Sequence, residues 1–268
     1  MNTIHLFADN NPIEIQRLQF PGGESHVRII GDAKPKRWTI RTDYRDDRDL
    51  IATALLCNAV RAQSSAPITL ITPYMPYARQ DRVATKGDSN AIQVIGAILG
   101  TLPIDEHIVW DMHSQAGLEY LGPLARSIPA ADFIRPLLNG TECLVAPDHG
   151  AIERTTACKI TPTQPIIYAT KERDPITGYL KNPKIIGDIP TNTELIVIDD
   201  ICDGGRTFLQ LGEVLRQHTT APLKLYVTHG IFSQGLNALR NIYDEILTPN
   251  PFNPELIPQL TIVPEPRP

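Results

Sequence analysis

Short runs of apolar and β-branched residues recur along the chain, and longer segments with helical spacing separate them. Runs of this length, rich in valine, isoleucine and leucine, are typical of strands that are buried on both faces. The predicted strands are residues 26–30, 68–72, 107–111, 143–147, 165–169, 195–200 and 223–229.

Between several of these strands, apolar residues recur at the spacing of a helix that buries one face. One predicted helix spans 49–63, a second follows Ser89, which is a suitable N-cap, and a third begins near Thr207. Strands that alternate with helices form mainly parallel sheets with helices on both faces. The pattern therefore predicts an α/β fold.

The strand and helix pattern starts again at 143–147, after a loop at 123–129 that contains two prolines. We therefore predict two domains, residues 1–133 and 134–268. From Pro249 onward seven prolines fall in twenty residues, which excludes a regular helix or a central strand. We expect this tail either to lie extended against the body of the protein or to be loose.

Composition and charge exclude several classes of protein. A net charge of −5 is unlike the basic face of a general nucleic-acid binder. No apolar run approaches the roughly 20 residues of a membrane helix, and the start of the chain does not resemble a signal peptide. The four cysteines never occur at Cys-x-x-Cys spacing, so neither zinc nor a disulfide framework is indicated. We expect a cytoplasmic protein with no nucleic-acid or membrane partner.

The strongest chemical signal follows the predicted strand 195–200. That strand ends in Asp199 and Asp200, and a turn containing Gly204 and Gly205 leads into the predicted third helix. Acids at the C-terminal end of such a strand lie where open α/β sheets bind ligands, and a carboxylate can accept both vicinal hydroxyls of a ribose. A glycine-rich turn at a helix N-terminus favours phosphate. The alternative is an acidic strand end with an ordinary glycine turn.

Three further segments carry polar residues that follow predicted strands. Residues 73–82, PYMPYARQDR, present two arginines suited to polyphosphate oxygens, or a solvated charge cluster. His113 and Asp148 follow two other strands and could share a Mg²⁺ ion, although a lone histidine is often structural. Lys171 and Arg173 belong to a charged loop that is either a cationic lid or a solvated turn.

Together these segments resemble the ribose-phosphate pyrophosphokinase family. The motifs PYARQDR, DMHS, APDHG, KER and VIDDICDGGRT occur in the family's order, and the likeness runs from LFADNN near the start to VTHGIFS at 227–233. The resemblance implies two phosphoribosyltransferase-like domains, an ATP side in the first and a ribose-phosphate side in the second, with the active site between them.

The resemblance also implies a role for each candidate residue. Mg²⁺ is the implied cofactor, ATP and a ribose 5-phosphate compound are the implied small-molecule partners, and Phe20 and Glu24 of FPGGE would reach the adenine of a neighbouring subunit's ATP. A homo-oligomer, a dimer or larger, is therefore expected. The implied residues are Arg79, Gln80, Asp81 and Arg82 for ATP; His113 and Asp148 for magnesium; Lys171 and Arg173 for catalysis; and Asp199, Asp200, Asp203, Gly204, Gly205, Arg206 and Thr207 for the ribose phosphate.

The implied reaction moves the β,γ-diphosphoryl group of Mg–ATP to the anomeric hydroxyl of ribose 5-phosphate and releases AMP. Two alternatives remain open: the same transfer onto ADP-ribose, which would link the chain to NAD metabolism, and a catalytically silent regulatory homologue. The chain departs from the family pattern at Gly22, where the family has aspartate, and at Arg206, which replaces a loop glycine. If that loop needs a positive φ at Arg206, the exchange would cost roughly 1–2 kcal/mol.

Overall fold

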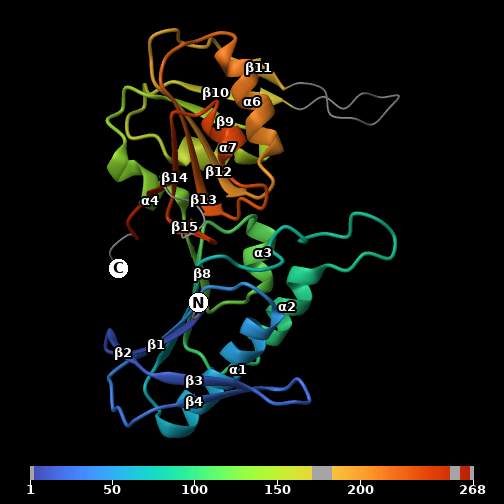
Figure 1. Ribbon diagram of the computed structural model, residues 1–268, viewed down its shortest axis with the longest axis vertical. Coiled ribbons are helices and arrows are strands. Elements are labelled where there is room, and N and C mark those ends of the chain that lie inside the picture. The colour runs from blue at the N-terminus through green and yellow to red at the C-terminus, as the bar shows by residue number, and fades with distance from the viewer. Residues whose placement is uncertain (1–2, 171–182, 254–259, 266–268) are drawn as a thin grey trace. The chain divides into compact units, whose positions relative to one another are not determined.

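The computed structural model describes residues 3–170, 183–253 and 260–265. The chain forms two compact units, residues 1–128 and 129–268 (Figure 1). The boundary lies before Pro129, whereas we placed it after Phe133. Residues 129–133 belong to the second unit because helix α4 (Ala130–Ile134) buries its apolar side chains there and contacts α5 (Ile152–Ala157).

The first unit is built on a six-stranded sheet in the order β2-β1-β5-β6-β7-β8. Strands β5 to β8 run parallel, while β1 is antiparallel to both of its neighbours. The strands are β1 (Ile4–Ala8), β2 (Asn11–Ile13), β5 (Trp38–Thr42), β6 (Ile68–Thr72), β7 (Glu106–Trp110) and β8 (Ala125–Ile128).

Three helices and a hairpin complete the first unit. The helices are α1 (Asp47–Gln63), α2 (Ala91–Leu99) and α3 (Gln115–Tyr120). Apolar residues of α1 and α2 join those of the sheet in one core cluster. Helix α2 is capped by Asn90, not by Ser89 as we predicted: the Asn90 side chain accepts a hydrogen bond from the Gln93 N–H.

The predicted strand 26–30 forms, but outside the main sheet. It is β4 (Ser25–Ile29), which pairs antiparallel with β3 (Ile15–Gln19) in a separate hairpin. Its residues alternate, with Val27 and Ile29 buried and Arg28 exposed, because only one face of the hairpin packs against α1 (Figure 1). A run that we expected to be buried on both faces is therefore buried on one.

The second unit is built on an eight-stranded sheet in the order β11-β10-β9-β12-β13-β14-β16, with β15 paired to β13. All of these pairings are parallel except that of β10 with β11. The strands are β9 (Cys143–Ala146), β10 (Ile166–Thr170), β11 (Lys184–Ile186), β12 (Leu195–Cys202), β13 (Leu223–Gly230), β14 (Glu245–Thr248), β15 (Asn250–Pro251) and β16 (Thr261–Ile262).

Helices cover both faces of this second sheet, as predicted. Side chains of Val145 and Val197 share a core cluster with α6 (Arg206–Arg216) and with residues around α7 (Asn237–Arg240). Alternate strand residues point to the opposite face, where α5 contacts β9, β10 and β12. Two short 3₁₀ turns, η1 (Arg135–Leu137) and η2 (His149–Ala151), connect this unit's elements.

The described part of the proline-rich tail lies extended against the second unit. It contributes only the two-residue strands β15 and β16, and β16 pairs with β14 at the edge of the sheet. Val263 follows β16 and is buried. A tail without regular helix or central strand was predicted, and the described residues agree.

The four cysteines are buried and free. Burial raises the pKa of the Cys57 and Cys202 thiols to about 12, and that of Cys143 to about 11. Among the described residues, no helix is both long and apolar enough to cross a membrane.

Candidate functional site

The two acids predicted to hold a sugar lie near the C-terminal end of β12, the strand between β9 and β13 in the second unit. Arg154 of α5 pairs with both: its Nη1 lies 3.4 Å from Oδ1 of Asp199, and its Nη2 lies 3.6 Å from Oδ2 of Asp200. All three side chains are at most 15% exposed. One guanidinium therefore offsets part of the repulsion between two adjacent carboxylates.

Local packing places Arg154 beside the acids. The neighbouring Thr155 is fully buried, and its hydroxyl donates to the carbonyl of Ile198 in β12 at 3.5 Å. This bond fixes α5 against the strand that carries Asp199. Sequence reasoning missed Arg154, although an arginine in the helix that follows APDHG is a signal that could have indicated it.

Burial raises the pKa of Asp199 well above its usual range, and the charge of Asp200 acts in the same direction. Arg154 opposes this shift, while Asp148 adds to it. The backbone N–H of Asp200 donates to Oδ1 of Asp199 at 2.9 Å. The result is a desolvated acidic pair whose charge Arg154 offsets in part, and hydrogen-bond donors of a ligand could complete the site.

The glycine-rich loop leads from β12 into α6. Gly205 has a φ of +76°, and α6 begins at the next residue without a side-chain N-cap. A helix N-terminus that no side chain caps is suited to an anion. Arg206 is the first helical residue and does not have a positive φ, so the strain we considered there does not arise. Its side chain is exposed.

The residues after β13 brace this loop. The N–H of Ser233 donates to the carbonyl of Asp203 at 3.1 Å, and the N–H of Ile231 donates to that of Cys202 at 2.9 Å. A Cβ added to Gly204 would meet only Cγ of Gln234, at 3.7 Å. The loop is thus held by backbone bonds while Gly204 itself is exposed.

In the first unit, the predicted ATP residues occupy the loop between β6 and α2. Arg79, Gln80 and Arg82 are exposed, and Asp81 is half-buried. The loop is attached to the start of α2, because the N–H of Ile92 donates to the carbonyl of Gln80 at 3.3 Å and the Asn90 amide donates to that of Asp81 at 3.3 Å. The guanidinium groups therefore extend from a fixed backbone.

The two predicted magnesium ligands belong to different units, and each is described within its own. His113 is exposed on the turn between β7 and α3, next to Ser114, which caps α3. Asp148 caps η2, with its Oδ1 accepting from the Ala151 N–H at 3.2 Å. No group of three potential metal ligands occurs in the described part of the chain. A carboxylate fits Mg²⁺, which takes few protein ligands and keeps several waters.

The FPGGE segment forms the turn of the β3–β4 hairpin. The backbone N–H of Phe20 donates to the carbonyl of Glu24 at 2.9 Å, and Gly23 has a φ of +98°. The Phe20 ring is half exposed and lies 5.7 Å from the His26 ring, measured between centroids. The three atoms nearest to a Cβ at Gly22 all belong to the flexible carboxylate of Glu24, which would have to move for an aspartate to fit there. Lys171 and Arg173 lie outside the described residues.

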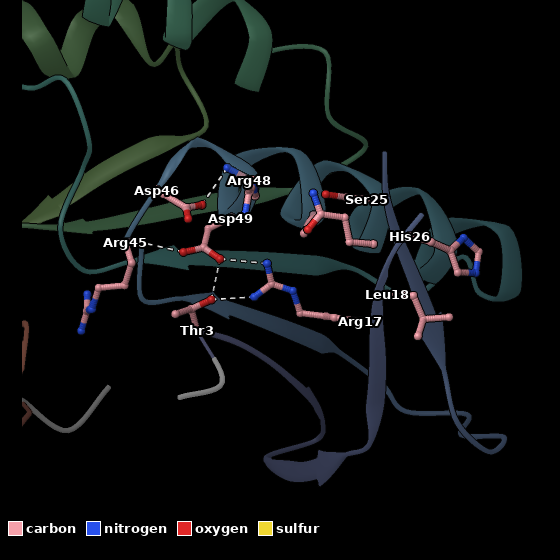
Figure 2. Close-up of a pocket in the computed structure, with 11 residues that line it drawn as sticks. Thr3, Arg17, Leu18, Ser25, His26, Arg45, Asp46, Arg48 and Asp49 are labelled. Carbon is pink, nitrogen blue, oxygen red and sulfur yellow. Dashed lines mark hydrogen bonds and ion pairs between the residues drawn. The ribbon is translucent and has the colours of Figure 1, made fainter. Parts of the chain in front are cut away.

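A cavity of about 340 Å³ lies between this hairpin and the start of α1. Figure 2 shows Asp49 at its centre, accepting from the Thr3 hydroxyl at 2.5 Å, from Nη2 of Arg17 at 2.9 Å and from the Arg45 N–H at 2.9 Å. None of the predicted site residues that the structure describes lines this cavity. Its polar network instead fixes the first turn of α1 against β3.

Comparisons with known proteins agree with this architecture. A family model for the N-terminal domain of ribose phosphate pyrophosphokinase matches residues 3–102. The chain is 30% identical to a ribose-phosphate pyrophosphokinase of Pyrococcus furiosus over 263 residues, which cover 94% of this chain and 90% of the relative. It is 28% identical to that of Pyrococcus abyssi over 228 residues, covering 84% and 79%.

A solved structure shares the fold. The phosphoribosylpyrophosphate synthetase from Mycobacterium smegmatis matches with a TM-score of 0.79 at 20% identity, over 95% of this chain and 87% of that one. The match extends through both units, so the α/β architecture deduced from the strand and helix pattern is confirmed.

Proposed function

This chain belongs to the ribose-phosphate pyrophosphokinase family, and we propose that it transfers the β,γ-diphosphoryl group of Mg–ATP to the anomeric hydroxyl of ribose 5-phosphate, with release of AMP. The observation that carries the proposal is the succession at the end of β12: two acids paired to one arginine, then a glycine loop that opens α6. Sugar hydroxyls and a phosphate need these two kinds of group side by side.

In this proposal the second unit binds the acceptor. Asp199, with Asp200 beside it, accepts hydrogen bonds from the ribose hydroxyls. The loop from Asp203 to Thr207 surrounds the 5-phosphate with backbone N–H groups, at the positive end of the α6 dipole. Arg154 does not contact the sugar in this scheme; it holds the two carboxylates in place.

The first unit binds the donor. Arg79 and Gln80, with Asp81 and Arg82 beside them, contact the ATP. Lys171 and Arg173, which lie outside the described residues, supply positive charge to the group in transfer. His113 and Asp148 would hold Mg²⁺, which when bound neutralises charge on the phosphates.

The reaction is mainly a matter of positioning and charge. The anomeric oxygen forms a bond to the β-phosphorus as the bond from that phosphorus to the α-phosphate oxygen breaks, so AMP leaves with the bond electrons. The hydroxyl proton passes to solvent. A loose transition state requires little assistance in removing that proton, and we assign no general base.

Product analysis tests the proposal. The protein is incubated with Mg–ATP and ribose 5-phosphate, and the nucleotides are separated by chromatography while mass spectrometry identifies the sugar product. We expect AMP to form in step with acceptor consumption, and none without magnesium. If ADP instead of AMP formed in step with acceptor consumption, the chain would be a simple kinase.

ADP-ribose is a second candidate acceptor, because of Arg206. This residue replaces a glycine of the family's loop, and its exposed side chain begins α6 beside the glycine turn. A guanidinium there can pair with a second phosphate, which ADP-ribose has and ribose 5-phosphate lacks. Measuring kcat/KM for both acceptors in the wild type and in Arg206→Gly decides: a preference unchanged by the substitution removes this candidate.

We further propose that the protein works as a dimer or larger assembly. Phe20 at the hairpin turn is 50% exposed, and Leu18 on the same hairpin is 42% exposed, which leaves apolar surface for a neighbouring subunit. Light scattering measures the mass directly. An active monomer would contradict a role for Phe20 and Glu24 in a neighbour's ATP site.

The remaining alternative is a regulatory homologue. A protein that shows no activity with either ribose 5-phosphate or ADP-ribose would support that alternative.

A further inference from the structure

We propose that Asp47 is a positioning residue for the ATP loop, and that it acts through the side chain of Tyr77. Asp47 is the first residue of α1, and Tyr77 lies between β6 and α2, two positions before Arg79. Nothing in the sequence motif connects them. The inference rests on the proposed function of the Arg79 loop.

Two tyrosines converge on one carboxylate oxygen of Asp47. The Tyr77 hydroxyl donates to Oδ1 at 2.5 Å, and the Tyr44 hydroxyl donates to the same atom at 2.7 Å. Both bonds lower the pKa of Asp47, because they stabilise its ionised form. The pKa of Tyr77 is raised for the reciprocal reason. Asp47 thus remains a charged acceptor at neutral pH.

Tyr77 needs such a restraint because of its backbone. Its φ of +64° lies in the left-handed region, which disfavours residues with a bulky side chain. Strained residues of this kind persist only where the surrounding structure holds them. The bond to Asp47 ties the far end of the tyrosine ring to a helix, and so restricts the backbone from which the ring projects.

The orientation of Tyr77 fixes the next residues. Its carbonyl accepts from the Gln80 N–H at 2.8 Å, which closes a turn that contains Arg79. The other end of this loop is tied to the start of α2 through the bond from Ile92 to the Gln80 carbonyl. Arg79 and Gln80 therefore project from a turn with two attachments, and Asp47 provides the first.

The first turn of α1, which carries Asp47, is held in place by hydrogen bonds. Two residues along α1, Asp49 is 3% exposed and accepts from Thr3, Arg17 and the Arg45 backbone (Figure 2). This network fixes the first turn of α1 to both β3 and the chain before β1. A helix anchored in this way can hold a loop residue at a set position, which a mobile surface side chain could not.

The experiment compares Asp47→Ala, Tyr77→Phe and the double variant with the wild type. Each single change should raise the KM for ATP, and the Kd of Mg–ATP measured by calorimetry, by about fivefold to tenfold, the effect expected of one lost hydrogen bond. The KM for ribose 5-phosphate should stay within about twofold, as that substrate binds the other unit. Both changes break the same hydrogen bond, the one from Tyr77 to Asp47. The double variant should therefore bind ATP no more weakly than Asp47→Ala alone.

Two further variants separate positioning from folding. Tyr44→Phe removes the second bond to Asp47 and the interaction of Tyr44 with the Tyr77 hydroxyl, but leaves the bond from Tyr77 to Asp47, so it should weaken ATP binding less than Tyr77→Phe does. Asp47→Asn keeps an acceptor oxygen and should recover part of the affinity lost in Asp47→Ala. Lower melting temperatures with unchanged ATP affinity, or effects of Asp47→Ala and Tyr77→Phe that multiply, would overturn the proposal.

The proposed function can fail separately. If the wild type binds Mg–ATP but yields no AMP with either acceptor, the catalytic assignment is wrong, and the calorimetric comparison still decides whether Asp47 positions the nucleotide loop. If the wild type binds no ATP, both fail together. AMP formation that is unaltered by Asp47→Ala at limiting ATP contradicts the positioning role alone.

Discussion

Nη1 of Arg154 lies 3.4 Å from Oδ1 of Asp199, although 45 positions separate the two residues in the chain. The same guanidinium lies within 3.6 Å of the adjacent Asp200 carboxylate. Since two ionised carboxylates side by side repel each other, their shared cation decides how firmly they can be held in the charged form that accepts sugar hydroxyls.

Arg154→Ala should weaken both the fold and acceptor binding. It removes the guanidinium that Asp199 and Asp200 share, so we expect a loss of about 2–3 kcal/mol in the free energy of unfolding at neutral pH, less at low pH where the acids take up protons. The KM for ribose 5-phosphate should rise about tenfold or more. Denaturation curves and steady-state kinetics measure the two effects.

A matched control is Arg126→Ala. Arg126 pairs with Glu106 at 2.8 Å, but the two side chains are 54% and 31% exposed. Exposed pairs contribute about 0–1 kcal/mol, so neither stability nor KM should change appreciably. Equal losses in the two variants would show that Arg154 has no special relation to the acceptor site.

Asp199 should give the protein a pH dependence opposite to that of an ordinary salt-bridged aspartate. Its pKa in the folded state is raised, chiefly by burial, so between 3.8 and the raised value the folded protein binds more protons than the unfolded chain. The free energy of unfolding should therefore fall as pH rises through that window, while kcat/KM for ribose 5-phosphate should rise as Asp199 ionises.

Asp199→Asn tests this sign. The variant cannot ionise at position 199, so its stability should exceed that of the wild type at pH 7 and lose the slope that Asp199 contributes. Acceptor binding should be weakened at every pH. Melting curves across pH measure the first effect; a variant that is less stable than the wild type at pH 7 would show that the charge of Asp199 is net favourable.

Gly205→Ala should disturb the phosphate loop, and Gly204→Ala should not unfold it. Gly205 has a φ of +76°, and a Cβ there would lie 3.3 Å from Cδ1 of Leu239, so we expect a loss of about 1–2 kcal/mol in stability together with weaker acceptor binding. At Gly204 the added Cβ makes only an ordinary contact. The free energy of unfolding of Gly204→Ala should stay within about 0.5 kcal/mol of that of the wild type. Similar melting temperatures for the two variants would contradict this account.

Lys171→Ala and Arg173→Ala should each reduce kcat by about a hundredfold or more, the usual effect of removing one transition-state contact. Lys34→Ala, at an exposed position of the first unit, is the control for loss of a positive charge. Rates are measured under saturating substrates, with melting temperatures alongside. Near-normal turnover in both loop variants would remove them from the catalytic assignment.

The hydrophobic pattern predicted the fold well, because strands that are buried in a parallel sheet consist of continuous runs of apolar residues. The run 195–200 became β12, and the helix expected over 49–63 became α1 (Asp47–Gln63). The pattern was less informative for 26–30, where one face of β4 meets α1 and the other is exposed. Apolar runs report burial, and they do not specify which sheet a strand joins.

The sequence predicted those parts of the candidate site whose residues follow one another along the chain. Asp199 and the glycine loop are contiguous with one strand and one helix, so local reasoning placed them. Arg154 and Asp47 were missed because each acts across a tertiary contact, with Asp199 and with Tyr77 respectively. The φ of Gly205 likewise had to be observed, since two adjacent glycines leave open which one takes the left-handed conformation.

The burial of all four cysteines limits the access of alkylating reagents to the native thiols, and the raised pKa of Cys57, Cys143 and Cys202 also suppresses their ionisation. Cys57 belongs to the first unit, while Cys143, Cys158 and Cys202 belong to the second. Labelling of Cys57 therefore requires opening of the first unit, and labelling of the other three cysteines requires opening of the second. The mass of each modified peptide then separates two unfolding equilibria that a single spectroscopic signal would merge.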